Sequence, residues 1–258
     1  MYTTSNEIMI ESIEIDLLVT EGLADKAKIT VDKVIKRIRE LISKIVNFIK
    51  GKLAKQTKQT EEVIKVVEKK VEAKEIGPEP PKPIKTLDLK KAQIILGNID
   101  LLLETVFKAS SVITSDINKD IEMVTEDLDN LKKVNEKFTG NLIVEYTGDI
   151  MNLVHGMKKL KYDAEYNLKM ITKVEGSITR KLNHLESTPS EKTPEMFKLV
   201  GLLQSSVSFA TRLNSIILSN IGTTFYKLTN KRNREYLKVF SINCVLPCLI
   251  ILLRQKIY

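Results

Sequence analysis

Histidine and cysteine, two side chains well suited to acid–base and metal chemistry, are scarce in this sequence. The chain has only two histidines, His155 and His184, and neither stands directly beside an acidic residue or a cysteine. A histidine in such a setting is more often an ordinary surface or core residue than a metal ligand or a general base. Cys244 and Cys248 lie four residues apart, which predicts two buried thiols on one helical face rather than a disulfide framework.

Acidic side chains gather between residues 116 and 129, where a metal site could be imagined. The cluster consists of Asp116, Asp120, Glu122, Glu126, Asp127 and Asp129. On a helix, a spacing of four puts pairs of these carboxylates on common faces. Helical bundles that hold two metal ions also need Glu-x-x-His pairs, and the sequence contains none. Three interpretations remain open: a solvated face, a docking surface for a basic segment of the same chain, and a metal site.

Sequence motifs of the common enzyme classes are missing. There is no Walker loop, no pair of glycines after a strand and no nucleophile elbow. We therefore expect a protein that is not an enzyme and has no catalytic residues, no metal site and no cofactor.

The strongest pattern in the sequence is an inversion of charge near the N-terminus. Residues 1–25 contain six acidic side chains and no lysine or arginine, whereas residues 26–58 contain eleven basic side chains and two acidic ones. Such charge blocks usually serve interactions rather than folding, and the net charge of +8 favours an anionic partner. The candidate contacts to that partner are Lys33, Lys36, Arg37, Arg39, Lys44, Lys50, Lys52 and Lys55.

The elements that must carry these residues are predicted to be helices. Residues 29–53 have apolar side chains at steps of three and four, the pattern of an amphipathic helix. Four prolines within residues 76–83 predict an extended linker. Further apolar series predict a helix over 87–138, which would be about 75 Å long at 1.5 Å per residue. Shorter series predict helices over 61–75, 150–185, 194–221 and 235–253, with Thr193 as an N-cap.

Together these elements predict an all-α protein, namely an elongated antiparallel helical bundle with an N-terminal amphipathic helical arm. The predicted domains are an acidic leader (1–25), a basic amphipathic helical arm (26–75), a proline-rich linker (76–86) and a long-helix bundle (87–258).

The basic amphipathic helix has three interpretations. It could be a core helix with a solvated, lysine-rich face. It could bind DNA phosphates without reading the sequence, which would make binding steeply salt-dependent. It could also lie in a membrane interface, because basic residues on one face and apolar residues on the other are typical of such helices.

Two short motifs in the acidic leader have an apolar residue two positions before a Glu and a small residue after it. They are Val-Thr-Glu-Gly at 19–22 and Met-Ile-Glu-Ser at 9–12. Combined with the charge inversion, this arrangement resembles structural and internal head proteins of tailed bacteriophages, whose acidic leader is removed by a prohead protease that cuts after Glu. Val19 and Met9 stand where that motif usually has Leu or Ile. The resemblance implies cleavage between Glu21 and Gly22, which would remove five acidic charges and raise the net charge from +8 to +13.

The same resemblance implies a non-enzymatic virion protein that is assembled in the host cytoplasm. Its expected partners are other virion proteins, packaged DNA through non-specific contacts, and further copies of itself in a homo-oligomer. The alternative is a membrane-associated or membrane-active helical protein that uses the basic amphipathic helix and the apolar C-terminus on a membrane surface.

Overall fold

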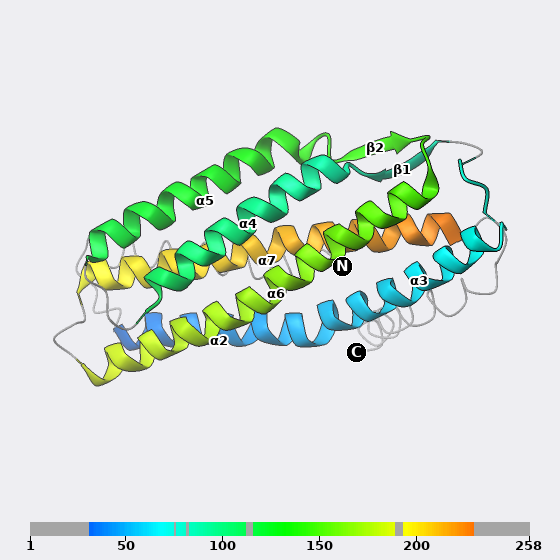
Figure 1. Ribbon diagram of the computed structural model, residues 1–258. Helices are drawn as coiled ribbons and strands as arrows, with labels where there is room; N and C mark the ends of the chain where they lie inside the picture. The colour runs from blue at the N-terminus through cyan, green and yellow to red at the C-terminus, as the bar shows by residue number, and fades with distance from the viewer. Residues whose placement is uncertain (1–30, 75, 81–82, 112–115, 189–192, 230–258) are drawn as a thin grey trace, which may run out of the picture.

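The computed structural model describes residues 31–74, 76–80, 83–111, 116–188 and 193–229, which form an elongated helical bundle with a small two-stranded sheet at one end (Figure 1). The prediction of an all-α bundle is confirmed. Several predictions fall outside the described residues, namely the acidic leader with Glu21 and Gly22, and the C-terminal segment with Cys244 and Cys248.

The N-terminal element is a continuous helix with a wider turn in its middle. It consists of α2 (Val31–Phe48), the π-helical turn η1 (Ile49–Leu53) and α3 (Ala54–Glu72). Apolar residues follow at steps of four through this turn, and all of them are buried: Leu41, Ile45, Ile49 and Leu53. Successive four-residue steps drift around a regular α-helix, and a wider turn cancels that drift. The π turn thus keeps the apolar stripe facing one way from α2 into α3.

This helix lies along the bundle and does not extend from it as a free arm. Both α2 and α3 contact α6 (Ile150–Ser187) and α7 (Pro194–Thr229). The predicted linker is also fastened to the bundle, because the Ile150 N–H donates to the Pro78 carbonyl at 2.8 Å. The apolar stripe that predicted an amphipathic helix is therefore part of the core.

The prediction of one helix over 87–138 is wrong, because the chain forms two helices there. They are α4 (Leu89–Ala109) and α5 (Ile117–Thr139), which pack against each other. Polar side chains hold the helix ends: Ser110 Oγ donates to the Phe107 carbonyl at 2.8 Å, and Asp116 accepts from the Lys119 N–H at 3.1 Å. Such local bonds compete with the helical backbone and favour helix ends.

A short antiparallel sheet, which the sequence did not predict, joins the start of α4 to the start of α6. Strand β1 (Ile84–Leu87) pairs with β2 (Ile143–Tyr146), with Ile84 opposite Tyr146 and Leu87 opposite Ile143. Strand β1 occupies the last part of the predicted linker, where Thr86 and Leu87 are buried.

The predicted helix over 150–185 is confirmed as α6, and the predicted start of the next helix is confirmed as well. The Met196 N–H donates to Thr193 Oγ1 at 3.2 Å, so that Thr193 caps α7. Gly156 lies inside α6 without breaking it. A Cβ at this position would clash with Leu89 Cδ1, so the glycine allows α6 to approach the start of α4 closely.

Helix α7 is the centre of the bundle. It contacts α2, α3, α4, α5, α6 and β1, and it runs through the middle of the molecule in Figure 1. Most of its apolar side chains are buried along its whole length, whereas Leu202, Phe209 and Ile216 are half-buried. Small and polar side chains of α7 are buried with them: Gln204, Ser205, Ser206, Ser208, Thr211, Asn214, Ser215 and Thr224. The other helices are therefore arranged around α7.

Candidate anion-binding surface

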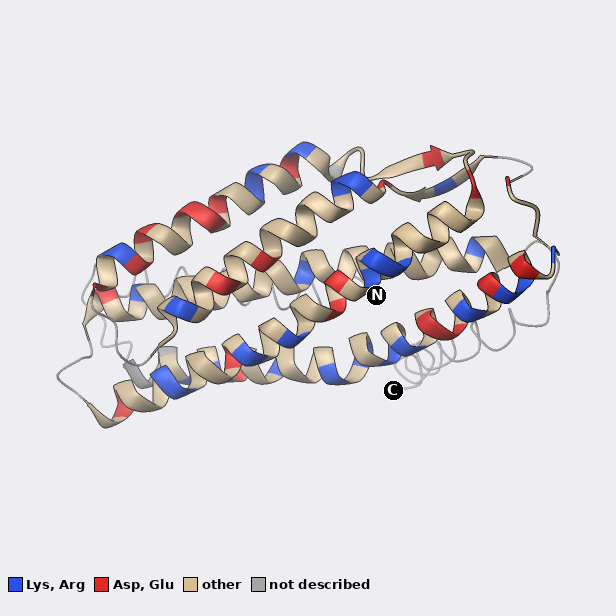
Figure 2. Cartoon of the chain, in the orientation of Figure 1, with Lys and Arg blue, Asp and Glu red and all other residues tan. Residues whose placement is uncertain are grey.

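Most of the predicted basic contacts lie on the solvent side of the α2–α3 helix. Figure 2 shows lysine and arginine along this helix. We call the exposed set the basic face, which consists of Lys36, Arg37, Lys44, Lys50, Lys52, Lys55 and Lys58. Lys33 lies in α2, but the structure does not describe its side chain. The basic face thus contains six of the eight residues that the sequence proposed, with Lys58 in addition.

Arg39 differs from the other basic residues of α2 because it points to α6. Its Nη2 donates to Asn183 Oδ1 at 2.6 Å and to Glu186 Oε2 at 2.7 Å. Arginine forms stronger bonds of this kind than lysine because its donors are fixed in one plane. Arg39 therefore fastens α2 to the C-terminal end of α6 and is not counted in the basic face.

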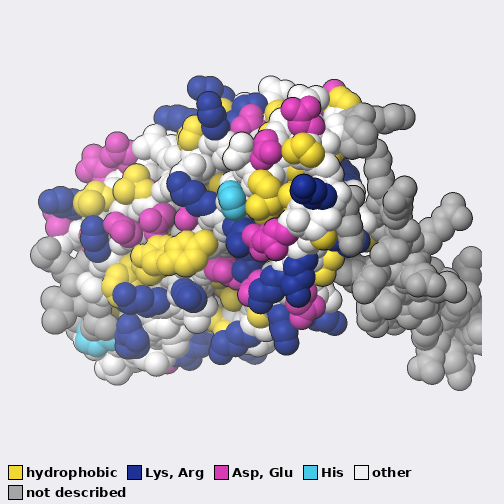
Figure 3. Space-filling view, turned by 45° about the vertical axis from the view of Figure 1, so that its right-hand side comes forward, with side chains coloured by type: hydrophobic (Ala, Val, Ile, Leu, Met, Phe, Trp, Pro, Cys, Tyr) yellow, Lys and Arg dark blue, Asp and Glu magenta, His cyan; other side chains and the backbone are white. Residues whose placement is uncertain are grey.

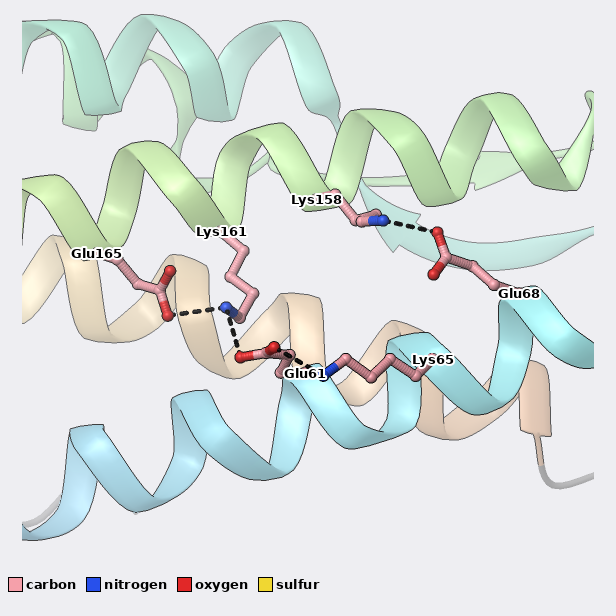
Figure 4. A network of polar contacts seen from close by, with 6 residues as sticks. All are labelled: Glu61, Lys65, Glu68, Lys158, Lys161 and Glu165. Carbon is pink, nitrogen blue, oxygen red and sulfur yellow. Dashed lines mark hydrogen bonds and ion pairs between the residues drawn. The ribbon is translucent and has the colours of Figure 1, made fainter.

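A network of ion pairs fastens α3 to α6 (Figure 4). Lys161 Nζ lies 2.8 Å from Glu165 Oε1 and 3.7 Å from Glu61 Oε2. Further along, Lys158 Nζ lies 2.7 Å from Glu68 Oε1. The hydrogen bond from Lys65, together with the nearby charge of Lys161, lowers the pKa of Glu61. Only the Lys161–Glu61 and Lys158–Glu68 pairs join the two helices, because Glu165 lies on α6 with Lys161, and partly exposed pairs of this kind contribute modestly to stability.

The basic face extends along α2, η1 and the first part of α3. From Lys36 to Lys58 the helix rises about 33 Å at 1.5 Å per residue, which is close to one turn of B-DNA. Lysine ammonium groups neutralise phosphates as point charges without reading base sequence. Within this stretch the single aromatic residue, Phe48, is buried. The face can therefore contact phosphates but offers no aromatic platform for unstacked bases.

Other exposed apolar side chains lie away from the basic face. In Figure 3 a short hydrophobic stripe runs between acidic and basic side chains. Among the described residues, large exposed apolar side chains on α4 and α6 are Ile94, Leu101, Tyr162 and Tyr166. On the α2–α3 helix Val66 is 45 % exposed, eight residues beyond Lys58, the last residue of the basic face.

The burial of the apolar stripe bears on the membrane interpretation of the basic helix. An interfacial helix must insert its apolar face into the lipid. Here the stripe faces α6 and α7, and Ile38, Leu41 and Ile45 have no exposed surface. None of the helices in the described ranges is long and apolar enough to span a bilayer.

The acidic cluster lies on α5, where its members differ in their surroundings. Asp116 caps the helix, Asp120 is half-buried, and Glu122 and Glu126 are exposed. Burial raises the pKa of Asp120, while the nearby charge of Lys181 opposes that shift. Within the described residues, no group of three or more His, Cys, Asp or Glu side chains could hold a metal ion.

The two histidines do not meet. His155 is exposed and His184 is half-buried, and both lie on α6. At 1.5 Å per residue they are about 43 Å apart along the helix. They therefore cannot belong to one metal or acid–base site.

A buried carboxyl group that the sequence analysis missed lies between α6 and α7. Glu175 is 1 % exposed, and its Oε1 accepts from Gln204 Nε2 at 3.2 Å. Burial raises the pKa of Glu175 to about 8, which the hydrogen bond from Gln204 only partly offsets. The signal was present in the sequence, because Glu175 lies four residues after Ile171 and three before Ile178, within the apolar series of the helix. A neutral carboxyl group of this kind is part of the core and not of a surface site.

These contacts describe a bundle in which the α2–α3 helix packs on α6 and α7 and presents the basic face to solvent. Comparison of the chain with protein-family models, with curated proteins and with solved structures finds no match.

Proposed function

We propose that this chain is a non-enzymatic structural protein of a phage virion, internal to the head, whose basic face contacts packaged DNA without reading its sequence. The observation that carries the proposal is the orientation of the α2–α3 helix. Its apolar stripe is buried against α6 and α7 while the basic face remains exposed to solvent.

This orientation favours DNA over a membrane as the anionic partner. A membrane helix would need the apolar stripe that the bundle has already buried. Phosphates need only the charges, and the basic face presents these along about one turn of a duplex. The ion pairs at Glu186, Glu61 and Glu68 hold the helix in this orientation.

The proposal predicts a salt-dependent affinity for duplex DNA that depends on the basic face. We expect replacement of Lys36, Lys50, Lys52 and Lys55 by Gln to weaken binding by about tenfold to a hundredfold at 50 mM salt. The slope of log K against log salt should become shallower by about 0.9 for each phosphate that the variant no longer neutralises. Fluorescence anisotropy with duplexes of two unrelated sequences, each at several salt concentrations, measures both effects.

A matched variant controls for the removal of four charges. Lys90, Lys119, Lys133 and Lys169 are also exposed but lie on α4, α5 and α6. Their replacement by Gln should reduce DNA binding much less than the same change on the basic face. Equal reductions in the two variants, or binding of the full chain to anionic liposomes but not to DNA, would contradict the proposal. Mass spectrometry of purified particles tests the virion assignment, which requires the chain to be found inside them.

A further inference from the structure

We propose that two copies of the chain form a dimer through the outer face of α4, in which the two α4 helices pack antiparallel about a two-fold axis near Gly97. The occupant of this face is thus a second copy of the same chain. The inference does not rest on DNA binding or on the virion assignment.

The outer face of α4 is apolar at its centre, although no described element covers it. Helix α4 packs against α5, α6 and α7 through its other sides, and in Figure 1 it lies between α5 and α6. Ile94 is 46 % exposed and Leu101 is 53 % exposed, and a spacing of seven puts both on one side of the helix. Gly97 lies between them and is exposed as well. A solvated helix face normally carries polar side chains, so these residues indicate a face that a partner covers.

Gly97 leaves room on this face for a second helix. A glycine inside a helix is unfavourable relative to alanine, because the glycine loses more conformational freedom on folding. The packing of the single chain does not require it, since a Cβ at position 97 would point into open space. Gly51 and Gly176 are open in the same way, but an exposed lysine lies within one turn of each, whereas the exposed Ile94 and Leu101 flank Gly97. A second helix that crosses α4 at this point would use the space that the missing side chain leaves.

The charges at the two ends of this face determine how the second helix is oriented. Lys90 and Glu104 are both exposed, and each lies seven residues from Gly97 on the same side of the helix. In an antiparallel pair centred on Gly97, Lys90 of each copy faces Glu104 of the other, and Ile94 of each copy lies beside Leu101 of the other. Two ion pairs thus flank an apolar centre, as in interfaces with a polar rim. A parallel pair would bring lysine against lysine and glutamate against glutamate, which is repulsive.

The charged side chains near this face are compatible with the same arrangement. Burial, together with the nearby charges of Glu104 and Asp163, raises the pKa of Asp100, which is half-buried. Glu104 therefore lies close to another carboxyl group of its own chain, and Lys90 of the second copy would reduce that repulsion. Lys108 is the next exposed residue along this side. It falls outside the helix pair, because the position opposite it precedes the start of α4.

Tyr166 of α6 widens the face next to the axis. The following residue, Asn167, donates from Nδ2 to the Leu96 carbonyl at 3.2 Å, which places this part of α6 beside Gly97. Tyr166 is exposed, and the two-fold axis would bring the tyrosines of the two copies near each other. Tyrosine is enriched in protein interfaces.

Sedimentation velocity with charge exchange inside one chain tests the dimer. Because the face is small, we expect a weak dimer with a Kd of about 100 µM, so the full chain should pass from monomer to dimer between about 10 and about 500 µM. Leu101→Lys and, separately, Glu104→Lys should each raise this Kd about tenfold. Lys90→Glu with Glu104→Lys in the same chain should restore the Kd to within about threefold of the wild type, because the two positions face each other across the axis. Glu122→Lys, which changes an exposed carboxylate on α5, should leave it unchanged.

Disulfide cross-linking tests the antiparallel orientation. In the full chain with Cys244 and Cys248 replaced by Ser, Ile94→Cys mixed with Leu101→Cys should form a covalent dimer about tenfold faster than either variant alone, because disulfides need closely spaced Cα atoms. Gly176→Cys, at an exposed site on α6, should cross-link slowly. Three outcomes would overturn the inference: a wild-type chain that is monomeric at about 500 µM, a double charge exchange that dimerises no better than Glu104→Lys, or cross-linking of Ile94→Cys that is fastest with itself.

Discussion

Replacement of Glu175 by Gln is expected to stabilise the folded chain at pH 7.5, by about 2–4 kcal/mol, or about 5–10 °C in melting temperature. The Glu175 side chain is buried between α6 and α7, and burial raises its pKa from 4.5 to about 8. A Gln side chain can still accept the hydrogen bond from Gln204 Nε2, but it carries no charge that must be neutralised for folding.

The sign of the pH dependence follows from the proton count of the two states. Between pH 4.5 and about 8 the folded chain keeps the proton of Glu175, whereas the unfolded chain has lost it. The folded state thus binds one more proton, and its stability falls by about 1.4 kcal/mol for each unit of pH in that window. Below pH 4.5 both states are protonated and above about pH 8 both are ionised, so this contribution to the slope vanishes at either end.

Urea unfolding at several pH values between 4 and 9 measures the free energy of unfolding of the wild type and of Glu175→Gln. The difference in this free energy between the two proteins should be near zero at pH 4 and should grow until about pH 8. Glu62→Gln changes an exposed carboxyl group on α3. Its free energy of unfolding should depend on pH in the same way as that of the wild type. A constant difference between wild type and Glu175→Gln over the whole range would refute the buried, neutral state of Glu175.

Replacement of Lys181 by Met is expected to destabilise the chain by about 2–4 kcal/mol. Lys181 is 1 % exposed, and its Nζ donates to the carbonyls of Ala109 at 3.1 Å and Ser111 at 2.8 Å. The Ala109 carbonyl belongs to the last residue of α4 and the Ser111 carbonyl lies two residues beyond it, at the helix end where a positive charge also interacts favourably with the helix dipole. Methionine fills a similar volume but donates no hydrogen bond, so the Ala109 carbonyl would remain buried without this partner.

Chemical denaturation gives the overall decrease in stability, and amide hydrogen exchange locates it. Exchange should become faster in the last turn of α4 and the first turn of α5, ahead of the rest of the bundle. Lys169→Met removes an exposed lysine from the same helix and should change stability by less than about 0.5 kcal/mol. If the two variants are destabilised equally, Lys181 does not hold the end of α4.

The sequence predicted which residues form helices better than it predicted what those helices pack against. The apolar stripe of residues 29–53 indicated the correct face of an amphipathic helix, but periodicity says nothing about what covers that face. The break between α4 and α5 was missed because Ser110 stands in phase with the apolar series on both sides. The N-cap of α5, Asp116, was the local signal for that break.

The candidate surface was also predictable only in part. The exposed lysines of α2–α3 could be identified because lysine is almost never fully buried. The role of Arg39 could not, because its partners Asn183 and Glu186 lie more than 140 residues further along the chain. Glu175 and Lys181 show the converse case. Their positions within the apolar series of α6 indicated burial, but the compensating partners come from α7 and from the end of α4.

The central position of α7 has a consequence for how the chain reaches its native state. All the other described helices precede α7 in the sequence and pack on it. During synthesis these earlier helices therefore leave the ribosome before α7, on which they pack, has been made. Contacts such as those of α2 with α7 also close very long loops, which slows folding. We expect the earlier helices to remain only loosely assembled, with apolar surface open to chaperones, until residues 194–229 have been synthesised and the whole bundle closes around them.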